Sequence, residues 1–219
     1  MTSRKRTNSP AAAAKTGGQP SQHKARPLEG YEVLLCVCGG IAAFKTAALA
    51  SQLAQAGAGV TVTMTRNGRR FVGPTTFRAL TGRPVHTTMW GREAAEFSHL
   101  RLSEAADLIV VAPATANVIG KLAGGIADDL VSTLLLGADS PVLMAPAMNT
   151  RMWQHASVQR NMKQLRADGV LTVGPDDGWL ACGDVGPGRM VSPQTLFDAI
   201  SEQLLSKPPK GARKPSSEA

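Results

Sequence analysis

The sequence predicts an α/β fold: a single domain with a doubly wound parallel sheet, Rossmann-like or flavodoxin-like, in three layers (α/β/α). Continuous apolar runs of four to six residues recur between residues 33 and 173, and such runs are typical of strands buried on both faces. Segments with helical spacing lie between these runs. Strands that alternate with helices predict parallel pairing.

Each predicted helix and strand follows from a local signal in the sequence. Glycines or prolines mark where predicted helices begin or end, and apolar runs mark the strands. The predicted strands are 33–37, 60–64, 85–90 (short and irregular, or at an edge), 108–113, 142–145 and 170–173. The predicted helices are 41–56, 75–80, one that follows His99 and ends near 106, 117–122, 130–136, 150–167 and 193–205. Residues 174–189 are rich in Gly, Pro and Asp, which indicates a lid or binding loop without regular structure.

Composition bounds the function. A chain of 219 residues with 43% hydrophobic content can bury one sizeable core. No apolar run is long enough to span a membrane, so no membrane association is expected. The net charge of +8 lies in the ends: residues 1–28 hold six Lys or Arg and no acid, and residues 207–219 hold four and one acid. The remaining residues carry a net charge of −1, which argues against a nucleic-acid partner.

The ends are predicted to be disordered tails, at residues 1–30 and 206–219, on either side of a folded domain at 31–205. Both are rich in Pro, Ser, Ala, Gly and Lys, a composition that buries too little apolar surface to fold. Residues 1–28 of the N-terminal tail are basic and free of acids, as transit peptides are. It lacks an apolar helical stripe, so a solvated extension is the favoured interpretation.

The cysteines do not indicate a disulfide framework, since their number, three, is odd. Cys36 and Cys38 point the same way on a predicted buried strand, where small apolar residues are ordinary. No nearby His or Cys completes a metal site, so no metal is expected. We expect a protein of the reducing cytoplasm.

The first predicted turn is a candidate phosphate site. Gly39 and Gly40 precede the first helix, and glycines there let a backbone approach a phosphate at a helix N-terminus. The pattern is not Gly-x-Gly-x-x-Gly, so a single phosphate is favoured over a dinucleotide. A plain tight turn is the alternative. Thr65, which ends the second strand, could donate to the same phosphate.

The loop that follows the strand at 142–145 is a second candidate site. Asn149 and Thr150 stand where a helix N-cap is expected, at the carboxyl end of a strand, where ligands bind in open parallel sheets. The loop would present one amide side chain and several N–H donors to a ligand, favouring an anionic one. A helix cap alone is the alternative role of Asn149.

Other small or polar residues give weaker evidence for a functional site. The small residues 114–117 follow the most apolar strand and leave room for a flat ligand. His99 lies beside leucines, where a structural role is as natural as a catalytic one. Asp128 and Asp129 precede a helix, and acids there suit capping better than acid–base catalysis.

Six motifs occur in one order along the chain, and together they are similar to those of the flavin-containing cysteine decarboxylases. The resemblance covers about residues 32–200. The motifs are GGIAAFK at 39–45, SHL at 98–100, APATAN at 112–117, DLVST at 129–133, PAMNTRMW at 146–153 and ACGDVGPGRM at 181–190. In bacteria such a domain is commonly fused to a C-terminal ligase. Because the chain ends soon after its last predicted helix, we expect the decarboxylase alone.

The resemblance implies a cofactor and an assembly. It implies FMN, bound between the subunits of a homotrimer that assembles further into a dodecamer. The residues that would contact FMN are Gly39, Gly40, Ile41, Ala42, Thr65, Pro113, Ala114, Thr115, Asn117 and Met148. The residues that would contact the substrate are Met148, Asn149, Ala181, Cys182, Gly183 and Arg189.

The resemblance also implies a reaction: decarboxylation of 4′-phosphopantothenoylcysteine to 4′-phosphopantetheine in coenzyme A synthesis. Flavin would oxidise the cysteinyl thiol to a thioaldehyde, whose sulfur accepts the electrons released with carbon dioxide as an enethiolate. The reduced flavin would then return a hydride. His99 would act as the base, Asn149 as the carboxylate clamp, and Cys182, on a mobile flap, as the acid.

Three alternatives share parts of this pattern. A peptidyl-cysteine decarboxylase stops at the enethiol and typically lacks the flap cysteine, so Cys182 argues against it. A flavin prenyltransferase shares the fold but not the motifs at 146–153 and 181–190. A regulatory subunit that inhibits a phosphatase needs no turnover but often has long charged tails, whereas these are short and basic.

Overall fold

The computed structural model describes residues 26–90 and 99–212. Its centre is a six-stranded sheet with the order β3-β2-β1-β4-β5-β6, in which every neighbouring pair is parallel. The strands are β1 (Glu32–Val37), β2 (Gly59–Met64), β3 (Val85–His86), β4 (Leu108–Ala114), β5 (Val142–Pro146) and β6 (Leu171–Thr172). The strand order runs outward from β1 in both directions, so the predicted doubly wound α/β fold is confirmed.

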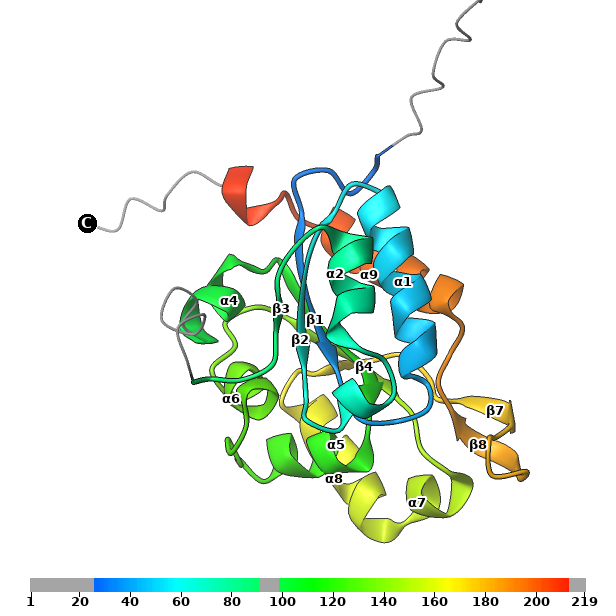
Figure 1. Cartoon of the computed structure of the whole chain (residues 1–219). Coiled ribbons are helices and arrows are strands. Elements are labelled where there is room, and N and C mark those ends of the chain that lie inside the picture. Colours follow the sequence, from blue (N-terminus) through cyan, green and yellow to red (C-terminus); the bar gives the residue numbers. More distant parts are fainter. Residues whose placement is uncertain (1–25, 91–98, 213–219) are drawn as a thin grey trace, which may run out of the picture.

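Helices cover both faces of the sheet (Figure 1). On one face lie α1 (Ala43–Gln55), α2 (Pro74–Thr81) and α9 (Pro193–Leu205), and on the other lie α4 (His99–Ala105), α5 (Ala116–Ala123), α6 (Leu130–Leu136) and α8 (Ala156–Ala167). Short elements complete the described part: α7 (Thr150–Gln154) and the 3₁₀ turns η1 (Gly68–Arg70) and η2 (Lys210–Ala212).

Two apolar cores hold these layers together, one on each face of the sheet. Side chains alternate along a strand, so neighbours in β1 enter different cores: Leu35 packs under α1 and α9, whereas Leu34 and Cys36 pack under α5, α6 and α8. Cys38 follows Cys36 into the same core and is buried like it. The predicted role of these cysteines as small core residues is confirmed.

Three predicted elements differ from the structure. The strand expected over 85–90 is paired only at β3. The helix expected over 150–167 divides at His155, whose backbone is extended and whose Nδ1 accepts from Ser157 N at 3.2 Å, so that it caps α8. The segment expected to be irregular forms an antiparallel hairpin, β7 (Asp176–Trp179) and β8 (Val185–Arg189).

The inner ends of both predicted tails belong to the folded body. Leu28 is fully buried in the core beside α1, so the body begins before residue 31. At the other end, Tyr31 Oη donates to Lys207 O at 2.9 Å, and Lys210 N donates to Asp107 Oδ1 at 2.6 Å. Residues 1–25 and 213–219 of the predicted tails lie outside the described residues.

Among the described helices, none combines the length and the apolar character that crossing a membrane requires.

Candidate active site

A cavity of about 550 Å³ opens at the carboxyl ends of β1, β4 and β5, the end of a parallel sheet where ligands bind. Its volume lies in the range of small-molecule and cofactor sites. Four segments contribute its walls: the turn after β1, the start of α5, the loop after β5 and the β7–β8 hairpin. The lining residues are Gly39, Gly40, Ile41, Ala42, Phe44, Lys45, Thr115, Ala116, Ala147, Met148, Asn149, Met152, Trp179, Leu180, Ala181, Cys182, Gly188, Arg189 and Met190.

The turn after β1 offers unpaired donors to this cavity. The N-cap of α1 is Ala42, which has no side chain able to cap. The amides of Ile41 and Ala42 make no hydrogen bond among the described residues. Free amides at a helix N-terminus form an anion site. A Cβ at Gly39 would collide with Asn67, so glycine is required there, and the turn fits the phosphate of a mononucleotide.

The other predicted FMN contacts divide into two groups. Pro113 and Thr115 lie beneath Gly40, at 3.7 and 3.6 Å from the place of its Cβ, and Thr115 also lines the cavity. The remaining three do not line it: Ala114 is buried in β4, Asn117 is exposed in α5, and the Thr65 hydroxyl accepts from Gly68 N at 3.0 Å.

Asn149 is both a cap and a wall of the cavity. Its Oδ1 accepts from Met152 N at 2.8 Å and so caps α7, while the residue lines the cavity beside Met148. Because the amide oxygen of Asn149 already accepts the capping hydrogen bond, its Nδ2 group is left to donate a hydrogen bond to a ligand. The two predicted roles of Asn149 are therefore compatible, and the cap orients the amide.

The β7–β8 hairpin carries Cys182 at its tip. Leu180 N donates to Asp184 O at 2.8 Å, and Gly183 N donates to Leu180 O at 2.9 Å, so the tip is a closed turn. The Cys182 thiol is exposed, lines the cavity and lies 3.5 Å from Asp184 Oδ2. Ala181, at the same tip, also lines the cavity, whereas Gly183 does not.

Two basic residues secure the hairpin base. Lys45 Nζ donates to Met190 O at 2.7 Å, which joins α1 to the end of β8. Burial and then the positive charge of Arg189 lower the pKa of Lys45 below its usual value. Arg189 in turn lies 3.9 Å from Asp176 across the hairpin. Arg189 was predicted to contact substrate; Lys45 was not a predicted site residue, although its motif pointed to this turn.

Some lining residues were not predicted as site residues, although two of them, Phe44 and Met152, belong to the motifs at 39–45 and 146–153. Phe44, Met152 and Trp179 line the cavity with exposed fractions of 60%, 44% and 66%. Large apolar side chains are ordinary core candidates in a sequence, and only their placement here distinguishes them. They leave an apolar rim around the cavity.

The structure leaves His99 untested. It is the first residue of α4, but its side chain lies outside what the structure describes. Its neighbours at 91–98 are also outside the described residues. Among the residues that are described, no three His, Cys, Asp or Glu side chains gather to hold a metal ion.

Comparison with known proteins was made on the sequence and on the structure. The family described as Flavoprotein matches residues 21–205. The coenzyme A biosynthesis bifunctional protein CoaBC of Bacillus subtilis is 52% identical over 181 residues, which are 82% of this chain and 45% of that protein. CoaBC of Escherichia coli is 44% identical over 172 residues, which are 78% of this chain and 42% of that protein. The chain thus spans about half the length of these relatives.

Solved structures give a consistent result. A Cys-to-Ser variant of PPC decarboxylase, complexed with pantothenoylaminoethenethiol, is similar with a TM-score of 0.69 and 29% identity; the match covers 78% of this chain and 97% of that one. The FMN binding protein AtHal3 has a TM-score of 0.70 and 28% identity, covering 82% of this chain and 100% of that one. The FMN-dependent cysteine decarboxylase SpaF has a TM-score of 0.69 and 33% identity, covering 82% and 98%.

Proposed function

Because the chain belongs to the flavoprotein family, we propose that it catalyses the FMN-dependent decarboxylation of 4′-phosphopantothenoylcysteine to 4′-phosphopantetheine in coenzyme A biosynthesis. One observation carries the proposal: Asn149 and Cys182, which are 33 positions apart in the sequence, line the same cavity as the free amides of Ile41 and Ala42. A phosphate site, an amide donor and a thiol are the groups that this reaction uses.

FMN fits the described cavity. The amides of Ile41 and Ala42 would hold its phosphate, with Gly39 and Gly40 giving the close approach. Thr115 and Met148 would border the ring and the ribityl chain, together with Pro113 beneath the turn. Thr65, Ala114 and Asn117 stay as proposed contacts, although they do not line the described cavity. When bound, FMN supplies the two-electron oxidation of the thiol and returns the electrons after decarboxylation.

The polar residues of the cavity have distinct roles. Asn149 Nδ2 would donate to the substrate carboxylate, held in place by the cap that its own Oδ1 makes. His99 would take the thiol proton as general base. Ala181, Gly183 and Arg189 would bind the substrate with the hairpin, and the cation of Arg189 suits an anionic substrate.

Cys182 would supply the proton that ends the reaction at phosphopantetheine. It stands at the tip of a hairpin over the cavity, next to Asp184, where its thiol reaches the space that the substrate would fill. A peptidyl-cysteine decarboxylase, which stops at the enethiol, has no need of such a donor. Cys182 thus favours the full reaction.

The surroundings of the cavity support an oligomer. Ile41, Phe44 and Trp179 are 59%, 60% and 66% exposed at its rim, and exposed apolar patches mark interaction sites. A neighbouring subunit would cover this rim and complete the site, in a homotrimer that assembles further into a dodecamer. The proposed location of the protein is the cytoplasm.

The absorption spectrum of the purified protein, followed by product analysis with phosphopantothenoylcysteine, tests the proposal. We expect a yellow protein that releases FMN on acid extraction and forms phosphopantetheine with carbon dioxide. FAD in place of FMN, or no flavin after reconstitution, would contradict the cofactor assignment. An enethiol as the final product would instead assign the chain to the peptidyl-cysteine decarboxylase type.

A further inference from the structure

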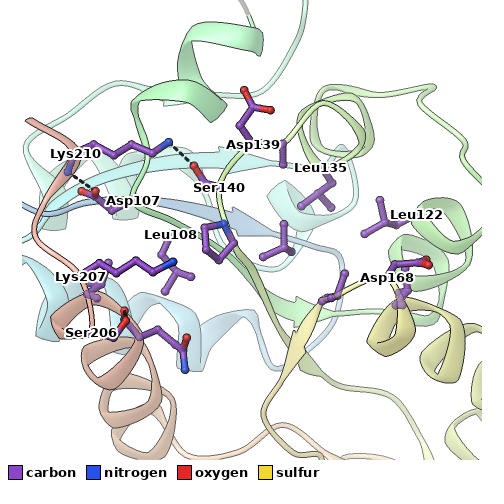
Figure 2. Close-up of a pocket in the computed structure, with 18 of the residues that line it drawn as sticks. Asp107, Leu108, Leu122, Leu135, Asp139, Ser140, Asp168, Ser206, Lys207 and Lys210 are labelled. Atoms are coloured by element: carbon purple, nitrogen blue, oxygen red, sulfur yellow. Dashed lines mark hydrogen bonds between the residues drawn. The ribbon is translucent and has the colours of Figure 1, made fainter. Parts of the chain in front are cut away.

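The C-terminal segment 206–212 returns to the end of the sheet opposite the active site. Figure 2 shows it beside a second cavity, of about 670 Å³, at the amino ends of β1, β4 and β5. Lys210 makes the main polar contacts between this segment and the rest of the fold. Its backbone amide donates to Asp107 Oδ1 at 2.6 Å, and its Nζ donates to Ser140 Oγ at 2.6 Å (Figure 2).

The same ammonium group reaches the helix α4. Lys210 Nζ donates to Glu104 O at 2.8 Å. Ser140 Oγ, which accepts from Lys210, lies 2.6 Å from Ala106 O and 3.2 Å from Ser103 O. The last carbonyl groups of a helix have no partner within it, so these contacts satisfy the C-terminal end of α4. A cation there also opposes the negative end of the helix dipole.

This capping matters because α4 is short. It has seven residues, about 10 Å of helix, and a helix of this length is not stable alone in water. Its order therefore depends on tertiary contacts at its ends and along its buried side. Two of the contacts at its C-terminal end come from distant parts of the chain, Ser140 two residues before β5 and Lys210 near the end of the described residues.

The opposite end of α4 begins with His99. A helix of two turns is stiff when it is formed, so loss of order at Glu104 is transmitted to residue 99. We propose that Lys210 is a positioning residue: by capping the C-terminal end of α4 it holds in place the helix whose first residue is the general base. The inference rests on the proposed function for the role of His99, and on the described contacts for the cap.

Lys207 provides a matched control. It lies three residues before Lys210 and lines the same cavity, and its Nζ makes no hydrogen bond or ion pair among the described residues. Its backbone carbonyl accepts from Tyr31 Oη at 2.9 Å. Lys207→Ala therefore removes an equal charge from the same segment without touching α4. Tyr31→Phe loosens the same segment at a different contact.

The experiment compares FMN-loaded full-length variants by hydrogen exchange and by steady-state kinetics. In Lys210→Ala we expect the amides that bond within α4, those of residues 103–105, to exchange about tenfold faster, the scale of one lost charge-assisted hydrogen bond. We expect kcat for decarboxylation to fall several-fold as His99 loses its fixed position, with KM and flavin content unchanged. Lys210→Arg, which keeps the charge and the donors, should recover most of the rate. In Lys207→Ala and Tyr31→Phe, the amides of α4 should exchange as in the wild type and kcat should be unchanged.

Several results would overturn the proposal. Unchanged exchange in α4 would show that Lys210 does not order the helix. Faster exchange with an unchanged kcat would leave a cap without a role in catalysis. If kcat falls equally in Lys210→Ala and Tyr31→Phe, the cause is general loosening of the C-terminal segment and not the cap on α4. If the wild type releases no carbon dioxide, the proposed function is wrong, and so is the role of Lys210 in that reaction. If the wild type is active and Lys210→Ala has the same kcat, only the role of Lys210 is wrong.

Discussion

Met148, in the loop after β5, and Gly188, in β8, lie backbone against backbone: Met148 N donates to Gly188 O at 2.9 Å. A Cβ at Gly188 would collide with Met148 O, and the φ of +131° is itself one that L side chains rarely adopt. Two residues earlier, a Cβ at Gly186 would lie 2.7 Å from Thr150 Oγ1. Glycines on one side of β8 thus allow the hairpin with Cys182 to rest on the loop with Asn149.

Gly188→Ala should separate these two loops. The new methyl group must displace Met148 O, so the hairpin moves away from Asn149 and the proposed proton donor leaves the proposed carboxylate clamp. We expect kcat to fall at least tenfold, about 1.4 kcal/mol in barrier, with FMN content unchanged. The measurement is the rate of phosphopantetheine formation.

Gly183→Ala is the matched control for this variant. Gly183 also has a positive φ, +91°, but a Cβ there meets no atom within 4 Å. Its substitution introduces backbone strain at the hairpin tip without a collision. If both variants lose activity equally, strain rather than the close approach to Met148 explains the effect, and the coupling of the two loops is not supported.

The sheet was predictable because its strands are buried on both faces. β4 and β5 read as continuous apolar runs, and helix signals between them implied parallel pairing. The N-caps at Asp129, Asn149 and Ser192 were predictable for a local reason, since each side chain accepts from an amide three residues ahead.

What escaped prediction depends on contacts between distant residues. The β7–β8 hairpin has no apolar alternation, because β8 is Val-Gly-Pro-Gly-Arg and is held by its glycines packing on another loop. Lys45 gave no sign that it would join α1 to Met190 O. The capping of α4 by Lys210 brings together residues 106 positions apart, which no local pattern indicates.

The two roles of Asn149 can be separated by Asn149→Asp. Asp caps a helix about as well as Asn, so α7 and the thermal stability should stay intact. The change replaces the Nδ2 donor with a negatively charged oxygen, which repels a substrate carboxylate. We expect carbon dioxide release to fall below detection while flavin binding is retained. Normal turnover would leave Asn149 as a cap only.

The Lys121 and Asp129 pair should give a pH-dependent contribution to stability. Burial opposes the ionised form of Asp129, but hydrogen bonds from Lys121 Nζ at 2.6 Å and Ser132 N at 2.9 Å outweigh it and lower its pKa. A lowered carboxylate pKa stabilises the fold above the ordinary value of 3.8, and this contribution is lost as the pH falls through the folded pKa.

Asp129→Asn tests this contribution, because Asn retains the cap of α6 and removes the charge. We expect a lower urea midpoint at pH 7, equivalent to about 1 kcal/mol or less for a partly exposed pair, and a difference that shrinks steadily as the pH falls below 3.8. Asp139, exposed and without an ion pair among the described residues, provides the control Asp139→Asn. A loss in Asp129→Asn that does not shrink as the pH falls would contradict the ionic origin.

Cys182→Ser should divide the reaction rather than stop it. In the proposed reaction, oxidation and decarboxylation would use FMN, His99 and Asn149, whereas return of the hydride would also need a proton at carbon. A Ser hydroxyl is nearly the same shape as a thiol but far less acidic. The variant should release carbon dioxide in a first turnover and then accumulate the enethiol beside reduced flavin. Bleaching of the yellow colour and a product two hydrogens lighter than phosphopantetheine are the measurements.

The alternative is that Cys182 is only a small residue in the turn of the hairpin. Its side chain is exposed and its one described contact, with Asp184 Oδ2, is long at 3.5 Å, so Ser would replace it easily on structural grounds. Exposure is also what a donor that must reach bound substrate requires. Undiminished phosphopantetheine formation by Cys182→Ser would therefore remove the thiol from the mechanism, and with it the residue that favours full decarboxylation over an enethiol product.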